Sequence, residues 1–108
     1  MKVSVIIPIY NTGEYLRACI GSICRQTHRD LQIIMIDDGS AETTAAICDQ
    51  IAASDHRITI VHKPNEGVSK ARNHGLEIAD GDVVCFVDSD DTIEPSMIED
   101  LLAAMERD

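Results

Sequence analysis

The sequence of 108 residues predicts one α/β domain in which a mainly parallel sheet is flanked by helices. Four short apolar segments rich in β-branched residues alternate with segments whose apolar residues recur every three or four positions. Each connection is long enough to hold a helix, which is the pattern of βαβ units. The apolar segments are nearly continuous, as is typical of strands buried on both faces of a parallel sheet.

The first strand is expected at Val3–Ile9, where nearly every position is apolar. Pro8 cannot donate to a strand ladder, so it is expected at the carboxyl end of this strand, where it can stiffen the edge of the sheet. A helix is expected over residues 14–26. Thr12 is the expected N-cap, and Glu14 is favourable at the positive end of the helix dipole.

The second strand is expected at residues 31–36 and the third, which is shorter, at residues 58–61. Between them, Ser40 is expected to cap a helix that continues to about Ser54. Glu42 falls in the first turn of this helix, where a negative charge is favourable.

Another helix is expected at Val68–Ile78, followed by a fourth buried strand at residues 83–87. Pro95 suits the first position of a final helix. The apolar face of that helix is formed by Met97, Ile98, Leu101, Leu102 and Met105.

The formal net charge of -10 argues against nucleic acid or an anionic membrane as the main partner. No apolar segment has the length of a membrane helix, and Pro8 ends the first apolar run too early for a signal peptide. We therefore expect a cytoplasmic location, with peripheral association at the inner membrane face as an alternative for a longer parent polypeptide.

The cysteines form no C-x-x-C pair and lie in apolar segments, so we expect buried, reduced thiols. The histidines lack the spacing of metal ligands, and we expect them in loops or on the surface. The residues concerned are Cys19, Cys24, Cys48 and Cys85, and His28, His56, His62 and His74.

Two acidic segments follow predicted strands: Asp37-Asp38 after the second and residues 88–91 after the fourth. Carboxyl ends of parallel strands share one edge of the sheet, which is where such sheets bind ligands. Several carboxylates repel one another unless a cation lies between them, and a hard divalent cation with oxygen ligands is the usual solution. The plainer alternatives are a helix cap with a glycine turn for the first segment and a solvated turn for the second.

Three basic residues, Lys63, Lys70 and Arg72, cluster around the third predicted helix in a chain with few bases. A solvated helix face is the plain interpretation of such a group. The same turn also carries Asn65 and Gly67, so a basic helix start opposite the acidic edge is expected to hold a diphosphate.

Four segments stand out along the chain: residues 3–11 (VSVIIPIYN), 36–40 (IDDGS), 65–75 (NEGVSKARNHG) and 86–91 (FVDSDD). Together they closely resemble glycosyltransferase family 2. The resemblance covers nearly the whole chain, with the motifs in order and at fitting separations. It implies a Rossmann-like GT-A fold, truncated here, with residues 1–108 as the nucleotide-sugar-binding part and the acceptor-binding half absent.

The family resemblance implies a metal-dependent, inverting transfer of a sugar from a nucleotide-diphospho-sugar, with a UDP-sugar as the expected donor. The implied acceptor is a growing polysaccharide or glycolipid, bound through the missing half. The implied cofactor is Mn²⁺ or Mg²⁺. Because the family's general base lies in the later half, we expect no catalytic residue within residues 1–108, and binding of the donor without sugar transfer.

The resemblance also assigns residues to the nucleotide. Pro8, Tyr10 and Asn11 would lie beside the base, and Asp38 would accept a hydrogen bond from a uracil-like base. Arg72 would lie near the nucleotide side of the cleft.

The family's Asp-x-Asp motif matches Asp88-Ser89-Asp90. Asp88 would face the ribose or the metal, Asp90 would ligate the metal that bridges the diphosphate, and Asp91 would lie behind them. The metal would act as a Lewis acid on the departing nucleoside diphosphate.

Three other functions fit parts of the sequence. A receiver-like domain that takes phosphate on an aspartate shares the acid pair, but here the pair follows the second strand and no fifth strand ends in a lysine. A dinucleotide-binding domain requires G-x-G-x-x-G after the first strand, where residues 8–11 stand instead. A non-catalytic interaction module would use the acidic edge to dock a basic partner, and nucleotide titration separates it from the enzyme.

Overall fold

The computed structural model describes residues 1–107, in which four parallel strands form one sheet in the order β3-β2-β1-β4. The strands are β1 (Val3–Ile9), β2 (Leu31–Asp38), β3 (Ile58–Lys63) and β4 (Val83–Phe86). The helices are α1 (Gly13–Cys24), α2 (Glu42–Ser54), α3 (Val68–Ile78) and α4 (Met97–Glu106). The predicted α/β class with a parallel sheet is confirmed.

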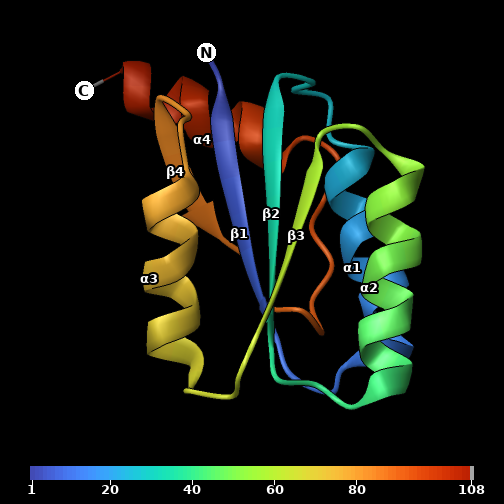
Figure 1. Cartoon of the computed structure of the whole chain (residues 1–108). Coiled ribbons are helices and arrows are strands. Elements are labelled where there is room, and N and C mark those ends of the chain that lie inside the picture. The colour runs from blue at the N-terminus through green and yellow to red at the C-terminus, as the bar shows by residue number, and fades with distance from the viewer. Residues whose placement is uncertain (108) are drawn as a thin grey trace.

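The helices cover the two faces of the sheet unequally. Figure 1 shows α1 and α2 on one face and α3 on the other, with α4 across the end of the sheet where β1 begins. Alternate residues of β1 enter different cores, as the twofold period of a strand requires. Val5 and Ile7 join the larger core with α1, α2 and α4, whereas Ile6 packs with Ala71 of α3.

Strand β2 is longer than the sequence predicts, because it pairs with β3 to its last residue. Asp37 lies opposite His62, and Asp38 lies opposite Lys63. Both aspartates are therefore buried strand residues and not parts of a turn, with exposed fractions of 2% and 4%. Hydrogen bonding across the sheet has overridden the low strand propensity of aspartate.

Strand β4 differs from the fully buried strand that was predicted. It lies at the edge of the sheet next to β1, and its residues are only partly buried. Phe86 at its end remains 45% exposed. An edge strand has a neighbour on one side only, which accounts for the exposure.

The predicted helix caps are replaced by longer-range contacts. Within residues 1–107, neither α1 nor α2 has a side-chain hydrogen bond at its N-cap. The hydroxyl of Thr12 pairs with that of Ser89, and the hydroxyl of Ser40 accepts from the backbone N–H of Asn11. Helix α4 begins at Met97 after Ser96, later than the Pro95 start that was predicted.

The four cysteines are free thiols, as predicted. Cys19 and Cys48 are fully buried, whereas Cys24 and Cys85 are partly buried. Burial raises the pKa of the Cys19 and Cys48 thiols to about 12, with nearby carboxylates adding to the shift, so both stay protonated and unreactive near neutral pH. Between residues 1 and 107, no helix has both the length and the apolar character needed to cross a bilayer.

Gly75 sets the distance between α3 and the sheet, since a Cβ atom there would lie 2.5 Å from Cγ2 of buried Ile6. We expect Gly75→Ala to lower the free energy of unfolding by about 1–3 kcal/mol, because overpacking outweighs the better helix propensity of alanine. Urea unfolding followed by circular dichroism measures this. Asn73→Ala, at an exposed position of the same helix, should change it by less than ~0.5 kcal/mol. Equal midpoints for the two variants would contradict the close packing of α3.

Candidate functional site

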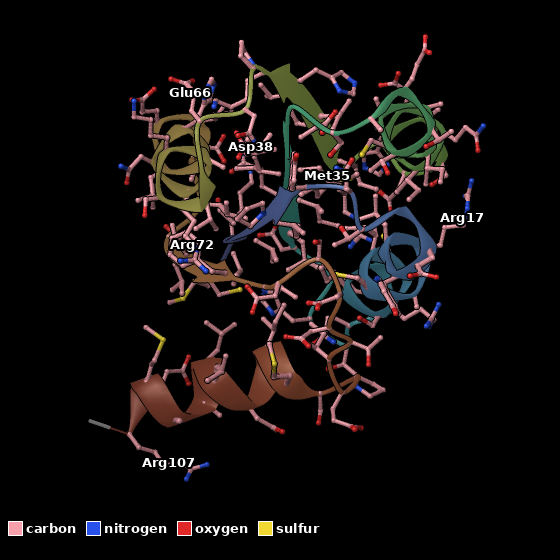
Figure 2. All side chains as sticks on the ribbon, turned by 90° about the horizontal axis from the view of Figure 1, so that it is seen from below. Arg17, Met35, Asp38, Glu66, Arg72 and Arg107 are labelled. Atoms are coloured by element: carbon pink, nitrogen blue, oxygen red, sulfur yellow. The ribbon has the colours of Figure 1, made fainter. Side chains whose placement is uncertain are left out.

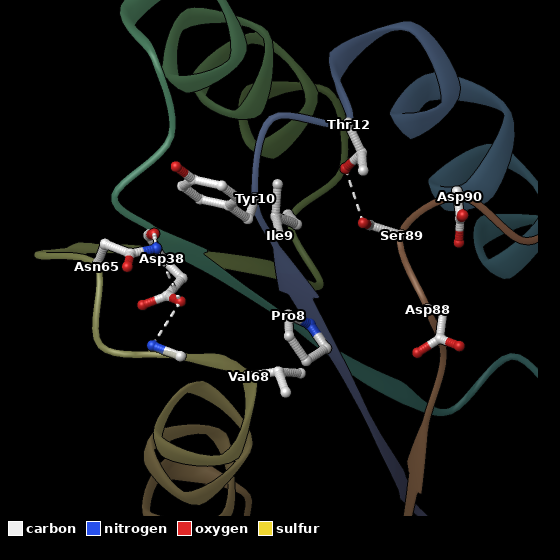
Figure 3. Close-up of a pocket in the computed structure, with 11 residues that line it drawn as sticks. Pro8, Ile9, Tyr10, Thr12, Asp38, Asn65, Val68, Asp88, Ser89 and Asp90 are labelled. Atoms are coloured by element: carbon white, nitrogen blue, oxygen red, sulfur yellow. Dashed lines mark hydrogen bonds between the residues drawn. The ribbon is translucent and has the colours of Figure 1, made fainter.

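A cavity of about 370 Å³ lies at the carboxyl ends of the strands. Its walls come from the carboxyl ends of β1 and β2 and from the segments that follow β1, β3 and β4, as expected for the ligand-binding edge of an open α/β sheet. The lining residues are Pro8, Ile9, Tyr10, Thr12, Asp38, Asn65, Gly67, Val68, Asp88, Ser89 and Asp90. Figure 3 shows Asp38 and Asn65 at one end and Asp88 and Asp90 at the other, with Pro8 and Ile9 between them.

The middle of the cavity is apolar. Pro8 and Ile9 end β1 there, and Val68 begins α3 beside them. Tyr10 follows β1 and keeps 54% of its surface exposed at the rim. An exposed aromatic ring next to apolar side chains can stack on a planar group of a ligand.

Asp38 is buried and held by the segment that precedes α3. Its carboxylate accepts from the backbone N–H of Glu66 at 2.9 Å and of Gly67 at 3.0 Å. The Lys63 ammonium and the Asn65 amide lie farther away, at 3.3 and 3.4 Å. Burial acts to raise the pKa of Asp38, but these hydrogen bonds outweigh it, so the pKa lies below its usual range. Asp38 is therefore ionised at neutral pH.

Gly39 lets the loop after β2 touch the loop before α3. Its φ is +74°, which favours glycine, and a Cβ atom there would lie 2.5 Å from the backbone nitrogen of Asn65. The Asn65 amide also donates to the Asp38 carbonyl oxygen at 2.9 Å. These contacts close one end of the cavity.

The acidic end is formed by the loop after β4. Ser89 is 6% exposed and points toward Thr12, and Asp88 and Asp90 lie on either side of it along the chain (Figure 3). Both carboxylate residues line the cavity, and their predicted roles at the metal and the nucleotide stay predictions. Asp91 instead lines a neighbouring cavity.

Arg72 lies in that neighbouring cavity and not among the lining residues of the first. Its guanidinium is 3.6 Å from an Asp88 carboxylate oxygen and lies over the Phe86 ring, 5.8 Å from the ring centre. Arg72 thus touches the acidic end from the α3 side.

Asn11 is also outside the lining residues. It adopts a positive φ of 54° and connects two loops, because its side chain accepts from the backbone N–H of Ala41 at 2.7 Å. The predicted contact of Asn11 with a nucleotide base stays a prediction.

The cavity is strongly acidic, since it is lined by three aspartates and, among residues 1–107, by no lysine or arginine. The basic helix start that was expected to face it is neutralised instead. Lys63 pairs with Asp38 and with Glu66, and Lys70 lies 3.6 Å from the same Glu66. Figure 2, seen toward the carboxyl edge, shows Glu66 near Asp38, in the segment before α3. A diphosphate placed next to Asp88 and Asp90 would be repelled unless a cation lay between them.

The residues present fit a divalent cation whose remaining coordination positions are filled by oxygens of a bound substrate. Within the described part of the chain, no three His, Cys, Asp or Glu side chains group closely enough to hold a metal ion. Asp88 and Asp90 supply hard oxygen ligands to the same cavity. Mg²⁺ is usually bound by one or two carboxylates together with phosphate oxygens of a substrate, which is the set this cavity can offer.

Comparison with known proteins decides the family. The family model described as "Glycosyl transferase family 2" matches residues 4–108. The chain belongs to glycosyltransferase family 2. The glycosyltransferase GlyG of Streptococcus pneumoniae serotype 4 is 42% identical over 100 residues, which cover 92% of this chain and 33% of GlyG. The chain thus spans about a third of the length of this curated relative.

Solved structures of the family share this fold. Residues 1–349 of S. aureus TarS, in complex with UDP-GlcNAc, superpose with a TM-score of 0.88 and 31% identity, covering 99% of this chain and 32% of that TarS chain. The mannosyltransferase PcManGT of Pyrobaculum calidifontis, in complex with GDP-Man and Mn²⁺, has a TM-score of 0.77 and 25% identity, covering 83% of this chain and 28% of that protein. The GT-A fold that was predicted is confirmed, and family membership argues against the receiver-like and dinucleotide-binding alternatives.

Some lining residues escaped the sequence analysis. Ile9, Val68, Thr12 and Ser89 line the cavity but were interpreted as strand, helix, cap and spacer residues. The position of Ser89 between the two aspartates of the acidic motif was a usable signal. Thr12 carried none, because only the fold brings it to Ser89.

His62 is a surface residue, as predicted, but it lies in a strand and its ring bridges two acids. It lies in β3, and its Nδ1 is 2.6 Å from an oxygen of buried Asp37 while its Nε2 is 2.7 Å from an oxygen of Asp49 on α2. A carboxylate only accepts hydrogen bonds, so both contacts are satisfied together only by the doubly protonated, cationic ring. The Asp49 and Asp37 hydrogen bonds accordingly raise the pKa of His62 above its ordinary value of 6.5.

A histidine with a raised pKa in the folded state stabilises the fold below its unfolded pKa, and this contribution is lost as the pH rises through the folded value. We therefore expect the free energy of unfolding to fall as the pH rises above about 6.5 through the raised pKa of His62. Urea unfolding at a series of pH values measures the slope. His62→Gln should flatten it, while His56→Gln at an exposed position should keep it. The same slope in wild type and His62→Gln would contradict the proposed role of the ring.

Proposed function

We propose that residues 1–108 form the nucleotide-sugar-binding part of a metal-dependent glycosyltransferase, with a UDP-sugar as donor and Mn²⁺ or Mg²⁺ as cofactor. One observation carries the proposal: a single cavity joins the Asp38 and Asn65 end to the Asp88 and Asp90 end. Three aspartates with no cationic lining residue among residues 1–107 make a metal-bridged diphosphate the best-fitting occupant.

The Asp38 end binds the base. The two short backbone bonds orient the carboxylate, and a donor from a ligand would replace one of the two longer side-chain contacts. An imide N–H, such as that of uracil, is the complementary donor. Tyr10 and Pro8 offer the flat, apolar surfaces between which a base can lie.

The Asp88 and Asp90 end binds the diphosphate through the cation. Asp90 would ligate the cation, and Asp88 would ligate it or accept from the ribose hydroxyls. When bound, the cation would supply Lewis-acid neutralisation of the charge that develops on the leaving nucleoside diphosphate. Arg72, 3.6 Å from Asp88, orients that carboxylate from outside the cavity and adds positive charge near the nucleotide.

The structural neighbours support both halves of this assignment. TarS was solved with UDP-GlcNAc, and PcManGT was solved with GDP-Man and Mn²⁺. A nucleotide sugar therefore accompanies this fold in both proteins, which are 31% and 25% identical to this chain, and Mn²⁺ accompanies it in PcManGT.

The remaining parts of the proposal concern the longer protein. The transfer would invert the anomeric centre, with a carboxylate base and an acceptor site supplied by the half of the fold that residues 1–108 do not include. The acceptor class, a growing polysaccharide or glycolipid, and the cytoplasmic location at or near the inner membrane face stay predictions.

Metal dependence is tested by titrating the chain with UDP. We expect Mn²⁺ to tighten UDP binding and EDTA to abolish this gain, because Asp88 and Asp90 repel a bare diphosphate. Asp90→Asn should reduce the gain by at least ~10-fold, as expected for a metal ligand. Asp30→Asn removes the same charge at the opposite edge of the sheet and should leave the gain unchanged. UDP binding that ignores Mn²⁺ would refute the metal site.

Base selectivity tests the role assigned to Asp38. With Mn²⁺ present, we expect UDP to bind at least ~10-fold more tightly than CDP, because N3 of uracil donates to a carboxylate whereas N3 of cytosine repels it. Calorimetric titration of both nucleotides at pH 7 measures the ratio in the unaltered chain, where Asp38 is ionised. Equal affinities would show that Asp38 does not read the base.

A further inference from the structure

The acidic loop lies along α1 for its whole length. Residues 87–96 connect β4 to α4 without regular secondary structure. In Figure 1 they pass from the carboxyl edge of the sheet to the opposite end, where α4 lies. Side chains at the start of α1, in its last turn and just after its end bond to this loop.

The first contacts fix the aspartate motif itself. The hydroxyls of Thr12 and Ser89 are 2.7 Å apart, and the Cys19 thiol donates to the Asp88 carbonyl oxygen at 3.5 Å. Because Ser89 is turned toward α1, its two neighbours Asp88 and Asp90 are left to face the cavity.

The middle of the loop is held by Ser22, which is 7% exposed. Its hydroxyl donates to the Cys19 carbonyl oxygen at 2.6 Å and accepts from the backbone N–H of Ile93 at 3.1 Å. The same helix turn that contacts Asp88 therefore also fixes the loop five residues later in the chain.

The far end of the loop is held by Gln26, which lies just beyond α1 and has no exposed surface. Its amide nitrogen donates to the carbonyl oxygens of Ser22 at 3.1 Å and Glu94 at 2.7 Å. Its amide oxygen accepts from the backbone N–H of Ile98 at 3.1 Å. One buried side chain thus satisfies backbone groups on α1, on the loop and on α4 together.

A loop of this length without such bonds would sample many conformations. The entropy cost of ordering it would lower the affinity for any ligand that contacts both aspartates. Repulsion between Asp88 and Asp90 would further favour conformations that separate them. A buried amide that cannot rotate without leaving three backbone groups unpaired opposes both effects.

We propose that Gln26 is a positioning residue of the metal site, which, acting with Ser22, orders the loop from α1 so that Asp88 and Asp90 face one cation. The inference rests on the proposed function, because it assigns a purpose to the order of the acidic loop. Gln26 acts through the loop and not on the base end, whose residues lie on β1, β2 and the segment before α3.

The test compares two binding constants in the same variant. Gln26→Met conserves volume but removes the three hydrogen bonds, and Gln50→Met is the control at an exposed glutamine that bonds Arg17. Mn²⁺ affinity is measured by electron paramagnetic resonance with UDP present, and uridine affinity is measured by calorimetry without metal. We expect Gln26→Met to weaken Mn²⁺ binding about 10-fold with uridine binding within about twofold of wild type, and Gln50→Met to change neither.

Ser22→Ala provides a second variant if Gln26→Met does not fold, and it should weaken Mn²⁺ binding about threefold with uridine binding intact. Unchanged Mn²⁺ affinity in a folded variant, or a parallel loss of Mn²⁺ and uridine binding, would overturn the positioning role. If the wild-type chain binds no Mn²⁺ in the presence of UDP, the proposed function fails and this inference fails with it.

Discussion

Repulsion among the carboxylates that the parallel sheet gathers at one edge is the constraint on which the rest of the site depends. The chain handles each of them differently. Asp38 is stabilised internally, by two backbone N–H groups and the Lys63 ammonium. Asp88 has Arg72 nearby at 3.6 Å. Asp90 has no ion pair among the described residues, so its charge is available to a cation that arrives with a ligand.

The two ends of the cavity are ordered by different means. The end with Asp38 is built on paired strands, so the positions of Pro8 and Asp38 follow from the ladder between β1, β2 and β3. The end with Asp88 and Asp90 follows an edge strand with one neighbour, and side chains of α1 order its loop. The proposed site needs a fixed surface for the base. It also needs a loop that holds two carboxylates close together against their mutual repulsion.

Ion pairing also explains why no lysine or arginine among residues 1–107 lines the cavity. Three basic residues lie near the start of α3, and each pairs with an acidic side chain. Lys63 pairs with Asp38 and Glu66, Lys70 with Glu66, and Arg72 with Asp88. His62 between Asp37 and Asp49 follows the same rule behind the site. Each buried acid near the carboxyl edge therefore has a cationic or N–H partner within the fold, and the cavity keeps its negative charge.

Sequence alone was enough to predict the succession of strands and helices along the chain, the parallel sheet, and the edge of the sheet that carries Asp38, Asp88 and Asp90. These features follow from apolar periodicity and from motifs, which are properties of neighbouring residues. The tertiary structure alone decided the hydrogen-bond partners: Thr12 meets Ser89 across 77 positions, and Gln26 meets Ile98 across 72. It also decided that β2 includes both aspartates and that β4 lies at an edge. Such pairings depend on which buried polar groups the packed fold brings within reach, and no local pattern encodes that.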